Sequence, residues 1–430
     1  MLKARWAQLL WQYSLCILAF AIALPFRFGS LAIIILALGW LLQLNISTTW
    51  HNLKTRKALW LWFIYFALHA ISYTYSQNKE QSLFDLQSKL SFVLLPLFIG
   101  TGSYISSRHT ERIFLFFISG VTSIALYTMV KHGLLYMRTH DLQSLFYNQL
   151  VEGLDANAVT QAWYAIFAIS ILLFSPWEHF FKKQYYYLKI ILIVLLTVFL
   201  ILLSARMLMA LYFVFILPFF ILQSVKKFSK VHLAIISIVV TTLAAILIFT
   251  ENPVKKRYED IFKINISQSF LDDYTHVAEG DFSNLTLRVF LWRLGFENMQ
   301  EHNLWLTGAG NGDVYKLQND KMHQYGMNMY PPVDEWRSPF YNANLHNMYL
   351  QSLLMLGIGG MVIFILISFS PFLKLTQIKY SRVFLVFNII AIFVMMQEAA
   401  LQSQGGIIYY TFFTQVFWLL YYTRSQEEIS

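Results

Sequence analysis

Apolar segments follow one another along most of the chain, separated by short polar breaks. A helix needs about 20 apolar residues to cross a bilayer, and fewer where interfacial side chains flank it. The pattern therefore predicts an all-α polytopic membrane protein with about 12 transmembrane helices, at 13–28, 30–45, 58–75, 89–105, 112–130, 158–175, 188–204, 207–223, 231–250, 347–370, 382–398 and 405–422.

The apolar run 188–222 is broken only at Ser204-Ala205-Arg206. As one helix its 35 residues would extend about 52 Å, far beyond a hydrocarbon core of about 30 Å. The run must therefore fold back, and Ser204 to Arg206 is the polar place to turn. Arg206 is expected at the outer membrane face.

The distribution of Lys and Arg sets the orientation, because short cytoplasmic loops are enriched in both residues. It predicts that both termini lie inside and that the long polar segment 251–345 lies outside. The expected organisation is nine transmembrane helices in 1–250, a periplasmic loop domain in 251–345 and three transmembrane helices in 346–430. Within the loop, 284–300 is expected to form an amphipathic helix, and 255–260 is interpreted as a solvated stretch.

Composition agrees with a membrane protein. The chain is 57% hydrophobic and 13% charged, whereas a soluble domain carries about 25% charged residues. Its single cysteine, Cys16, excludes an intrachain disulfide. The net charge of +9 is explained by the cytoplasmic loops and does not indicate nucleic-acid binding.

His346 stands where the long polar segment meets the tenth predicted helix, and Asn347 follows it. An imidazole exchanges protons near neutral pH, so this histidine is a candidate general base or a group that positions an acceptor hydroxyl. The alternative is an interfacial histidine that only caps the tenth predicted helix, with Asn347 satisfying the start of that helix. Taken alone, the residue favours the capping interpretation.

Arginines on the same predicted face are candidates for binding an anion. A guanidinium offers a planar fork of donors that matches phosphate oxygens. Arg206 sits at the predicted turn, while Arg288 and Arg293 lie in the predicted loop helix beside Trp292. The alternatives are an Arg206 that snorkels to the lipid headgroups and a solvated helix face for Arg288 and Arg293.

Other kinds of site have little support in the sequence. The loop histidines are too scattered for a metal-ligand signature, and no P-loop is present. Gly308, Gly310 and Gly312 are better explained by turns than by a phosphate loop, because no strand clearly precedes them. Among the few intramembrane acids, Glu398 at the outer end of the eleventh predicted helix is the notable one.

Three motifs together resemble the bacterial O-antigen ligase and polymerase superfamily. They are His346-Asn347 followed after nine residues by Gly357 and after two more by Gly360, Ser204-Ala205-Arg206 opening an apolar segment, and Arg288 with Trp292 ahead of Leu306-Thr307-Gly308-Ala309-Gly310-Asn311-Gly312. The predicted layout, with a large outer loop between helices nine and ten, is similar as well.

The resemblance implies a metal-independent glycosyltransferase of the GT-C type that needs no cofactor. Such enzymes pass a glycan from undecaprenyl pyrophosphate to an acceptor hydroxyl at the periplasmic face of the inner membrane. Arg206 and Arg288 would hold the pyrophosphate and offset charge on the leaving group. His346 would orient or deprotonate the acceptor, and the expected substrate-binding set is completed by Arg293, Asn347 and Trp292.

The resemblance is compatible with more than one acceptor. Ligation to lipid A core is the leading prediction, and a polymerase or a protein O-oligosaccharyltransferase of the same superfamily would use the same donor. A transporter or flippase of lipid-linked glycan is an alternative of another class. It would predict charged residues along a central path through the helices, whereas the charges here gather at one face.

Overall fold

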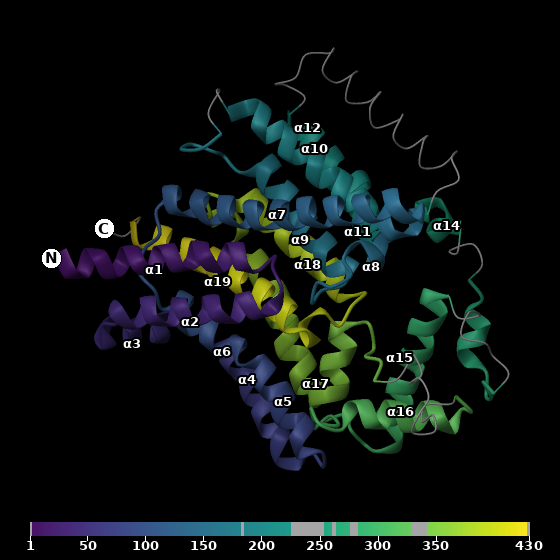
Figure 1. The fold of residues 1–430 in the computed structure, drawn as a ribbon. Coiled ribbons are helices and arrows are strands. Elements are labelled where there is room, and N and C mark those ends of the chain that lie inside the picture. The colour runs from purple at the N-terminus through teal and green to yellow at the C-terminus, as the bar shows by residue number, and fades with distance from the viewer. Residues whose placement is uncertain are drawn as a thin grey trace.

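The computed structural model describes residues 2–181, 185–224, 253–259, 264–275, 283–327 and 342–427, and within these ranges the chain is helical and contains no β-strand (Figure 1). The predicted span 231–250 lies outside the described residues. The all-α prediction is confirmed for the part of the chain that is described.

Among the described helices, five are long and apolar enough to cross a membrane: Lys79–Gly100, Ser107–Thr139, Tyr186–Leu203, Arg206–Gln223 and Met348–Leu375. A sixth is obtained if α2 (Phe26–Leu42) and α3 (Ile46–Thr55), which meet at 113°, form one broken span. Three shorter apolar helices are Trp6–Ala21, Ala158–Phe174 and Ser381–Met395. The count of twelve spans therefore stays a prediction.

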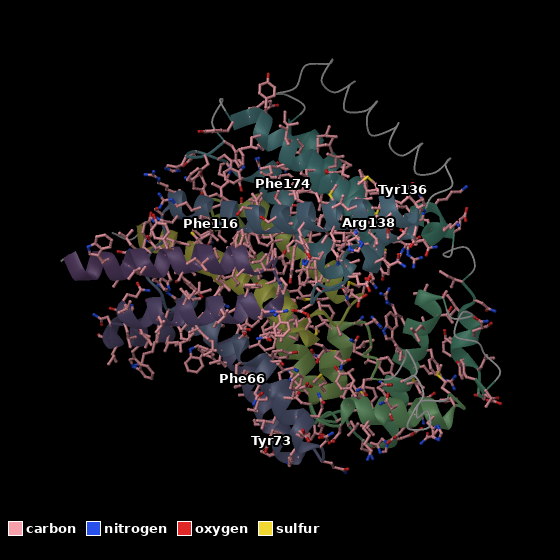
Figure 2. All side chains as sticks on the ribbon, viewed as in Figure 1. Phe66, Tyr73, Phe116, Tyr136, Arg138 and Phe174 are labelled. Atoms are coloured by element: carbon pink, nitrogen blue, oxygen red, sulfur yellow. The ribbon has the colours of Figure 1, made fainter. Side chains whose placement is uncertain are left out.

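The apolar α9 (Ala158–Phe174) lies at the centre of the helical bundle, as expected for a helix that is hydrophobic on every side. It packs against α7 (Ser107–Thr139), α10 (Tyr186–Leu203) and α18 (Ser381–Met395). At its end lies Phe174, which is labelled in Figure 2. Its ring centroid is 5.5 Å from that of Phe219, so α9 also contacts α12 (Leu217–Ser224).

Other helices pack around this group or extend away from it. α1 (Leu2–Ala21) packs on α2 and α7, and the two chain ends lie on one side of the molecule (Figure 1). The other segments are α4 (Ala58–Tyr75), η2 (Leu142–Leu145), α8 (Tyr147–Leu150), η8 (Ser370–Gln377), η9 (Ala400–Gln402) and α19 (Gln404–Glu427).

Several of the predicted helices have different limits in the structure, and 112–130 is part of the longer α7 (Ser107–Thr139). The segment predicted at 13–28 is α1, which ends at Ala21 because a turn leads to Pro25 ahead of α2. The segment predicted at 89–105 begins earlier, since α5 (Lys79–Lys89), α6 (Ser91–Leu95) and η1 (Pro96–Gly100) run together. Lys89 and Asp85 pair at 3.8 Å inside this run, and the pairing makes their burial tolerable.

The predicted reversal at Ser204 is confirmed. α10 ends at Leu203, Ser204 adopts a left-handed conformation with φ of 48°, and α11 (Arg206–Ala210) starts two residues later. It continues through η4 (Leu211–Ile216) into α12. The hydroxyls of Thr197 and Tyr212, one on each limb, are 3.0 Å apart, so the limbs lie side by side.

The described part of the long polar segment is helical and lies away from the chain ends (Figure 1). It contains α14 (Pro253–Glu259), η6 (Ile266–Phe270), α15 (Asn284–Glu301) and α16 (Val314–Gln324). The predicted helix 284–300 is confirmed as α15, which begins where the Ser283 hydroxyl accepts the N–H of Thr286.

A backbone lock joins this segment to α17 (Met348–Phe369). Gly357 interrupts α17 with φ of 69°, a conformation that glycine adopts without strain. The break frees backbone groups that the 305–310 segment then satisfies: Ile358 N–H donates to Trp305 O at 2.8 Å, and the carbonyls of Leu354 and Met355 accept from the N–H groups of residues 309 and 310. The segment is thereby fixed against α17.

Candidate functional site

Glu398 is the centre of the candidate site. It lies three residues after the end of α18, where its backbone N–H still donates to Val394 O at 2.8 Å. Its side chain is 17% exposed, so a charge there is partly removed from water and needs partners.

Two of the predicted catalytic residues supply those partners. Arg288 on α15 donates from Nη2 to Glu398 Oε1 at 2.8 Å. His346 Nδ1 lies 2.9 Å from Oε2 of the same carboxylate. The carboxylate therefore joins an arginine and a histidine that are 58 positions apart in the sequence.

Two hydrogen bonds hold the backbone around His346. Its N–H donates to Asn344 Oδ1 at 2.8 Å, and its φ of 44° places it in the left-handed region. The Trp292 indole N–H donates to Leu345 O at 2.7 Å. A non-glycine residue in this conformation persists only where its surroundings fix it, and such residues gather at functional sites.

Asn347 caps α17. Its Oδ1 accepts from the N–H groups of Tyr349 and Leu350 at 3.0 and 3.1 Å, and its Nδ2 donates to Met396 O at 3.2 Å. The capping interpretation thus describes Asn347 and not His346. The amide also ties the start of α17 to the segment that carries Glu398.

A cavity of about 270 Å³ opens beside Glu398, and we call it the arginine cavity after Arg206, Arg257 and Arg288 in its wall. Glu398 is the one carboxylate among its described lining residues. A concave site with an excess of one charge attracts ligands of the opposite charge. The arrangement is suited to an anion with several oxygens.

Arg257 belongs to this cavity although the sequence pattern placed it in a solvated stretch. α14 turns it inward, where its guanidinium carbon lies 3.3 Å from the centre of the Tyr147 ring. Its Nε is buried and has no hydrogen-bond partner among the described residues. The Arg206 Nη1 donates to the Arg257 carbonyl at 2.6 Å, so the two arginines are placed together.

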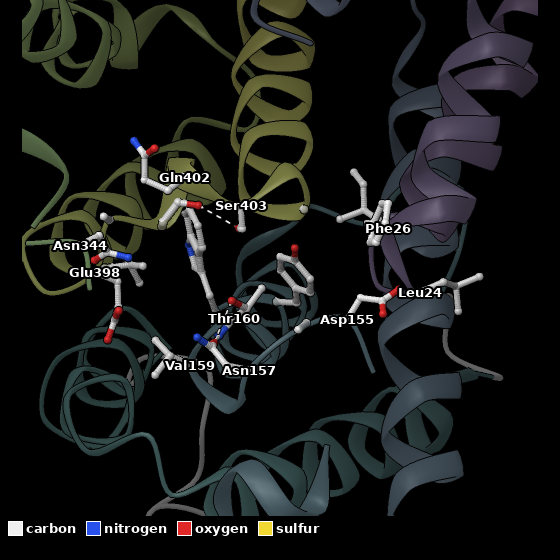
Figure 3. Close-up of a pocket in the computed structure, with 18 of the residues that line it drawn as sticks. Leu24, Phe26, Asp155, Asn157, Val159, Thr160, Asn344, Glu398, Gln402 and Ser403 are labelled. Carbon is white, nitrogen blue, oxygen red and sulfur yellow. Dashed lines mark hydrogen bonds between the residues drawn. The ribbon is translucent and has the colours of Figure 1, made fainter. Parts of the chain in front are cut away.

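A second cavity, of about 460 Å³, also has Glu398 in its wall (Figure 3). Glu398, Val159 and Val394 line both cavities. We call the second one the amide cavity, because Asn157, Asn344 and Gln402 contribute side-chain amides to its wall.

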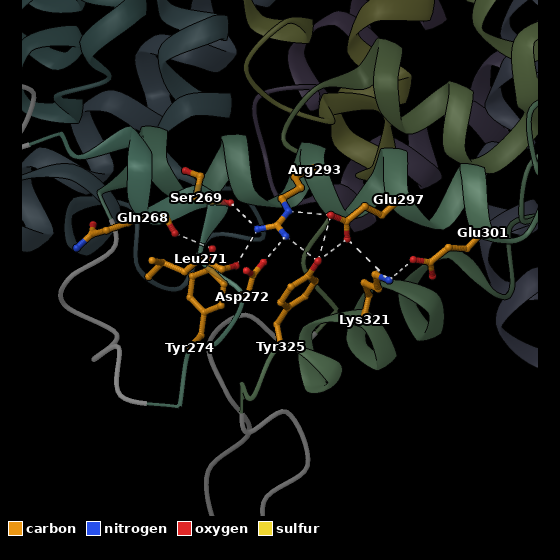
Figure 4. Close-up of polar contacts among 10 residues, drawn as sticks. All are labelled: Gln268, Ser269, Leu271, Asp272, Tyr274, Arg293, Glu297, Glu301, Lys321 and Tyr325. Carbon is orange, nitrogen blue, oxygen red and sulfur yellow. Dashed lines mark hydrogen bonds and ion pairs between the residues drawn. The ribbon is translucent and has the colours of Figure 1, made fainter.

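Arg293 lies elsewhere, although it is only five residues from Arg288. It donates to Glu297 Oε1 at 2.7 Å and to the Tyr325 hydroxyl at 2.7 Å, within a network that also contains Lys321 (Figure 4). Partial burial opposes its charge, but the Glu297 carboxylate holds the pKa of Arg293 above its ordinary value. The structure does not bring Arg293 to Glu398.

The glycine cluster of the loop does not offer its backbone to a phosphate. The N–H groups of Gly308, Ala309 and Gly310 donate to carbonyls of Leu304 and α17. Those of Asn311 and Gly312 donate to the hydroxyls of Ser72 and Ser76 on α4, both at 3.3 Å. These hydrogen bonds attach the glycine cluster to α17 and α4, in agreement with the interpretation as turns.

One group of three potential metal ligands is found in the described ranges, formed by Glu111, Glu178 and His179. The Glu111 carboxylate already accepts from the backbone N–H groups of 178–180 at 2.8, 3.0 and 3.1 Å. Glu111 thereby fixes the loop after α9, and the group contains none of the residues around Glu398.

Comparison with known proteins adds one finding. Residues 191–365 match the family model described as O-antigen ligase. The match includes Arg206, Arg257, Arg288 and His346, and it ends before Glu398. No curated protein matches the chain.

Proposed function

Because the chain belongs to the O-antigen ligase superfamily, we propose that it transfers a glycan from undecaprenyl pyrophosphate to an acceptor hydroxyl. The proposed reaction takes place at the periplasmic face of the bacterial inner membrane, in a GT-C-like protein. The leading acceptor is lipid A core. The observation that carries the proposal is the arginine cavity beside the Glu398–His346 pair.

The arginine cavity is proposed to hold the pyrophosphate of the donor. Guanidinium groups bind phosphate oxygens through paired, charge-assisted hydrogen bonds. As the bond between the anomeric carbon and the pyrophosphate oxygen breaks, negative charge grows on the leaving group. Arg206, Arg257 and Arg288 then stabilise that charge from fixed positions, which is the usual source of large catalytic effects. They supply the positive charge that a metal ion provides in other enzymes.

His346 is proposed to take the proton of the acceptor hydroxyl. An ionised Glu398 carboxylate only accepts hydrogen bonds, so Nδ1 of His346 carries the hydrogen and Nε2 keeps its lone pair. The acceptor oxygen bonds to the anomeric carbon, its proton moves to Nε2, and pyrophosphate leaves with the electrons of the broken bond. Glu398 stabilises the imidazolium that forms, as a carboxylate does for histidine in other dyads.

Complementation of a strain that lacks this gene tests the proposal. Wild type, His346→Ala and Arg288→Ala are compared at matched membrane levels, with surface polysaccharide separated on a gel. Loss of attached polymer with accumulation of lipid-linked long chains is the result expected for a ligase. A single repeat still attached to the core would instead identify a polymerase. Wild-type behaviour of both variants would overturn the transferase and favour a transporter.

A further inference from the structure

We propose, on the premise of the function proposed above, that the amide cavity binds the acceptor sugar and selects an uncharged pyranose over one that carries a carboxylate or a phosphate. The cavity is next to the proposed reacting groups, because Glu398 lines both this cavity and the arginine cavity. Asn344, which accepts the backbone N–H of His346, also lines it. A sugar held there lies beside Glu398, the carboxylate that contacts His346.

The wall of the amide cavity is suited to hydroxyl groups. The Thr160 hydroxyl and backbone N–H both donate to Asn157 Oδ1 at 2.9 Å, which leaves the Asn157 NH₂ and the Thr160 oxygen lone pairs for a ligand. Gln402 donates to the Met355 sulfur at 3.4 Å and keeps its amide oxygen as an acceptor. Neutral hydrogen-bond donors and acceptors therefore line one cavity. A few convergent polar groups of this kind are typical of ligand-binding sites.

A buried donor in the same wall is without a partner. Trp163 is 1% exposed, and its indole N–H makes no hydrogen bond among the described residues. A buried donor left unpaired is costly, and most such groups are satisfied in native proteins. A ligand hydroxyl in this cavity would satisfy it. The rings of Trp163, Tyr164 and Tyr315, all in the wall, combine apolar faces with polar edges, as a pyranose does.

Charge distinguishes the two cavities. The described lining of the amide cavity contains Asp155 and Glu398 and no lysine, arginine or histidine. Glu398 is paired with Arg288, so a carboxylate or phosphate on the sugar would meet the unpaired charge of the exposed Asp155. Such a like-charge contact is disfavoured, and no cation in the described wall of the cavity offsets it. The same anion would be attracted to the arginine cavity. The donor and the acceptor are thus directed to different cavities.

The test uses the full-length protein in detergent micelles and two soluble probes, methyl glucoside and methyl glucuronide. Binding is measured by saturation-transfer NMR with wild type, Asp155→Arg, Gln402→Leu and Asp141→Arg. Asp141 is the matched control, because it lies between α7 and α9 as Asp155 does but lines a different cavity. We expect wild type to bind the glucoside in preference to the glucuronide and Gln402→Leu to weaken the glucoside signal.

Asp155→Arg is expected to raise the glucuronide-to-glucoside ratio about threefold, the modest size of an effect from an exposed charge, and Asp141→Arg to leave it unchanged. Equal binding of both probes to wild type, a glucoside signal that Gln402→Leu does not weaken, or an unchanged ratio in Asp155→Arg would overturn the inference. The proposed function is tested separately, by whether Arg288→Ala and His346→Ala abolish transfer.

Discussion

Nδ1 of His346 lies 2.9 Å from Oε2 of Glu398, although His346 precedes α17 and Glu398 follows α18. Asn347 reinforces this contact by donating to Met396 O, two residues before Glu398. The orientation of the imidazole thus depends on two helix ends that meet at one point. A histidine that only capped α17 would need neither the Glu398 carboxylate nor the Arg288 guanidinium that is bound to that carboxylate.

Replacing Glu398 by Gln is expected to lower the transfer rate without removing donor binding. An amide cannot stabilise the imidazolium, and its NH₂ group competes for the position that Nδ1–H requires. Loss of a carboxylate with this role lowers turnover by roughly 10²- to 10⁴-fold. The measurement is single-turnover transfer with purified protein over a range of donor concentrations.

Donor affinity separates a catalytic effect of Glu398→Gln from structural damage. The arginines of the cavity are still present in the variant, so the apparent affinity for donor is expected to stay within about threefold of wild type, a change worth less than about 1 kcal/mol. A variant that turns over at the wild-type rate would show that Glu398 is not part of the proton transfer.

Arg257→Gln is expected to weaken donor binding. A hydrogen bond to a charged group contributes about 1.5–3 kcal/mol, so the loss of one guanidinium corresponds to roughly a 10- to 150-fold increase in the apparent donor KM. Lys256→Gln is the matched control, because Lys256 is the adjacent cation on α14 and is exposed. Equal effects of the two substitutions would indicate general attraction of an anion rather than a contact by Arg257.

Several residues of the candidate site could be recognised from the sequence alone. His346, Arg288 and Arg206 are recognisable because each is a polar residue at the edge of an apolar segment or within an apolar helix face. Glu398 stands out for the same reason, as an acid at the end of an acid-poor span. Their pairing through one carboxylate was not predictable, because it depends on how α15, α17 and α18 pack together.

Arg257 and the amide cavity were missed for a different reason. Lys255, Lys256 and Arg257 form an ordinary basic run, and only the direction of α14 separates the inward arginine from the exposed lysine. The amide cavity gathers residues from five separate parts of the chain, and no local pattern connects them. The predicted limits of the helix at 89–105 also differ from the structure, where the helical run begins at Lys79. Asp85 and Lys89 pair inside this run, so charged residues lie within it.

Asn347→Ala is expected to impair both stability and transfer. Removing an Asn cap costs about 0.5–2 kcal/mol, and the contact to Met396 O disappears at the same time. Asn347→Asp retains the capping oxygen but not the donor to Met396. If the cap alone matters, Asp restores both thermal stability and transfer. If the link to the Glu398 segment matters, Asp restores stability and leaves transfer low.

Gly357→Ala is expected to destabilise the protein, whereas Gly359→Ala is not. Gly357 has φ of 69°, and a Cβ there would lie 2.3 Å from the Leu306 carbonyl oxygen. Backbone strain of this kind costs about 1–3 kcal/mol, and relieving it would pull the 305–310 segment away from α17. A Cβ on Gly359 would meet nothing within 4 Å, and alanine favours the helix. Thermal unfolding of both variants in detergent, followed by tryptophan fluorescence, should show a lower midpoint only for Gly357→Ala. Equal midpoints would mean that the break in α17 does not hold the loop in place.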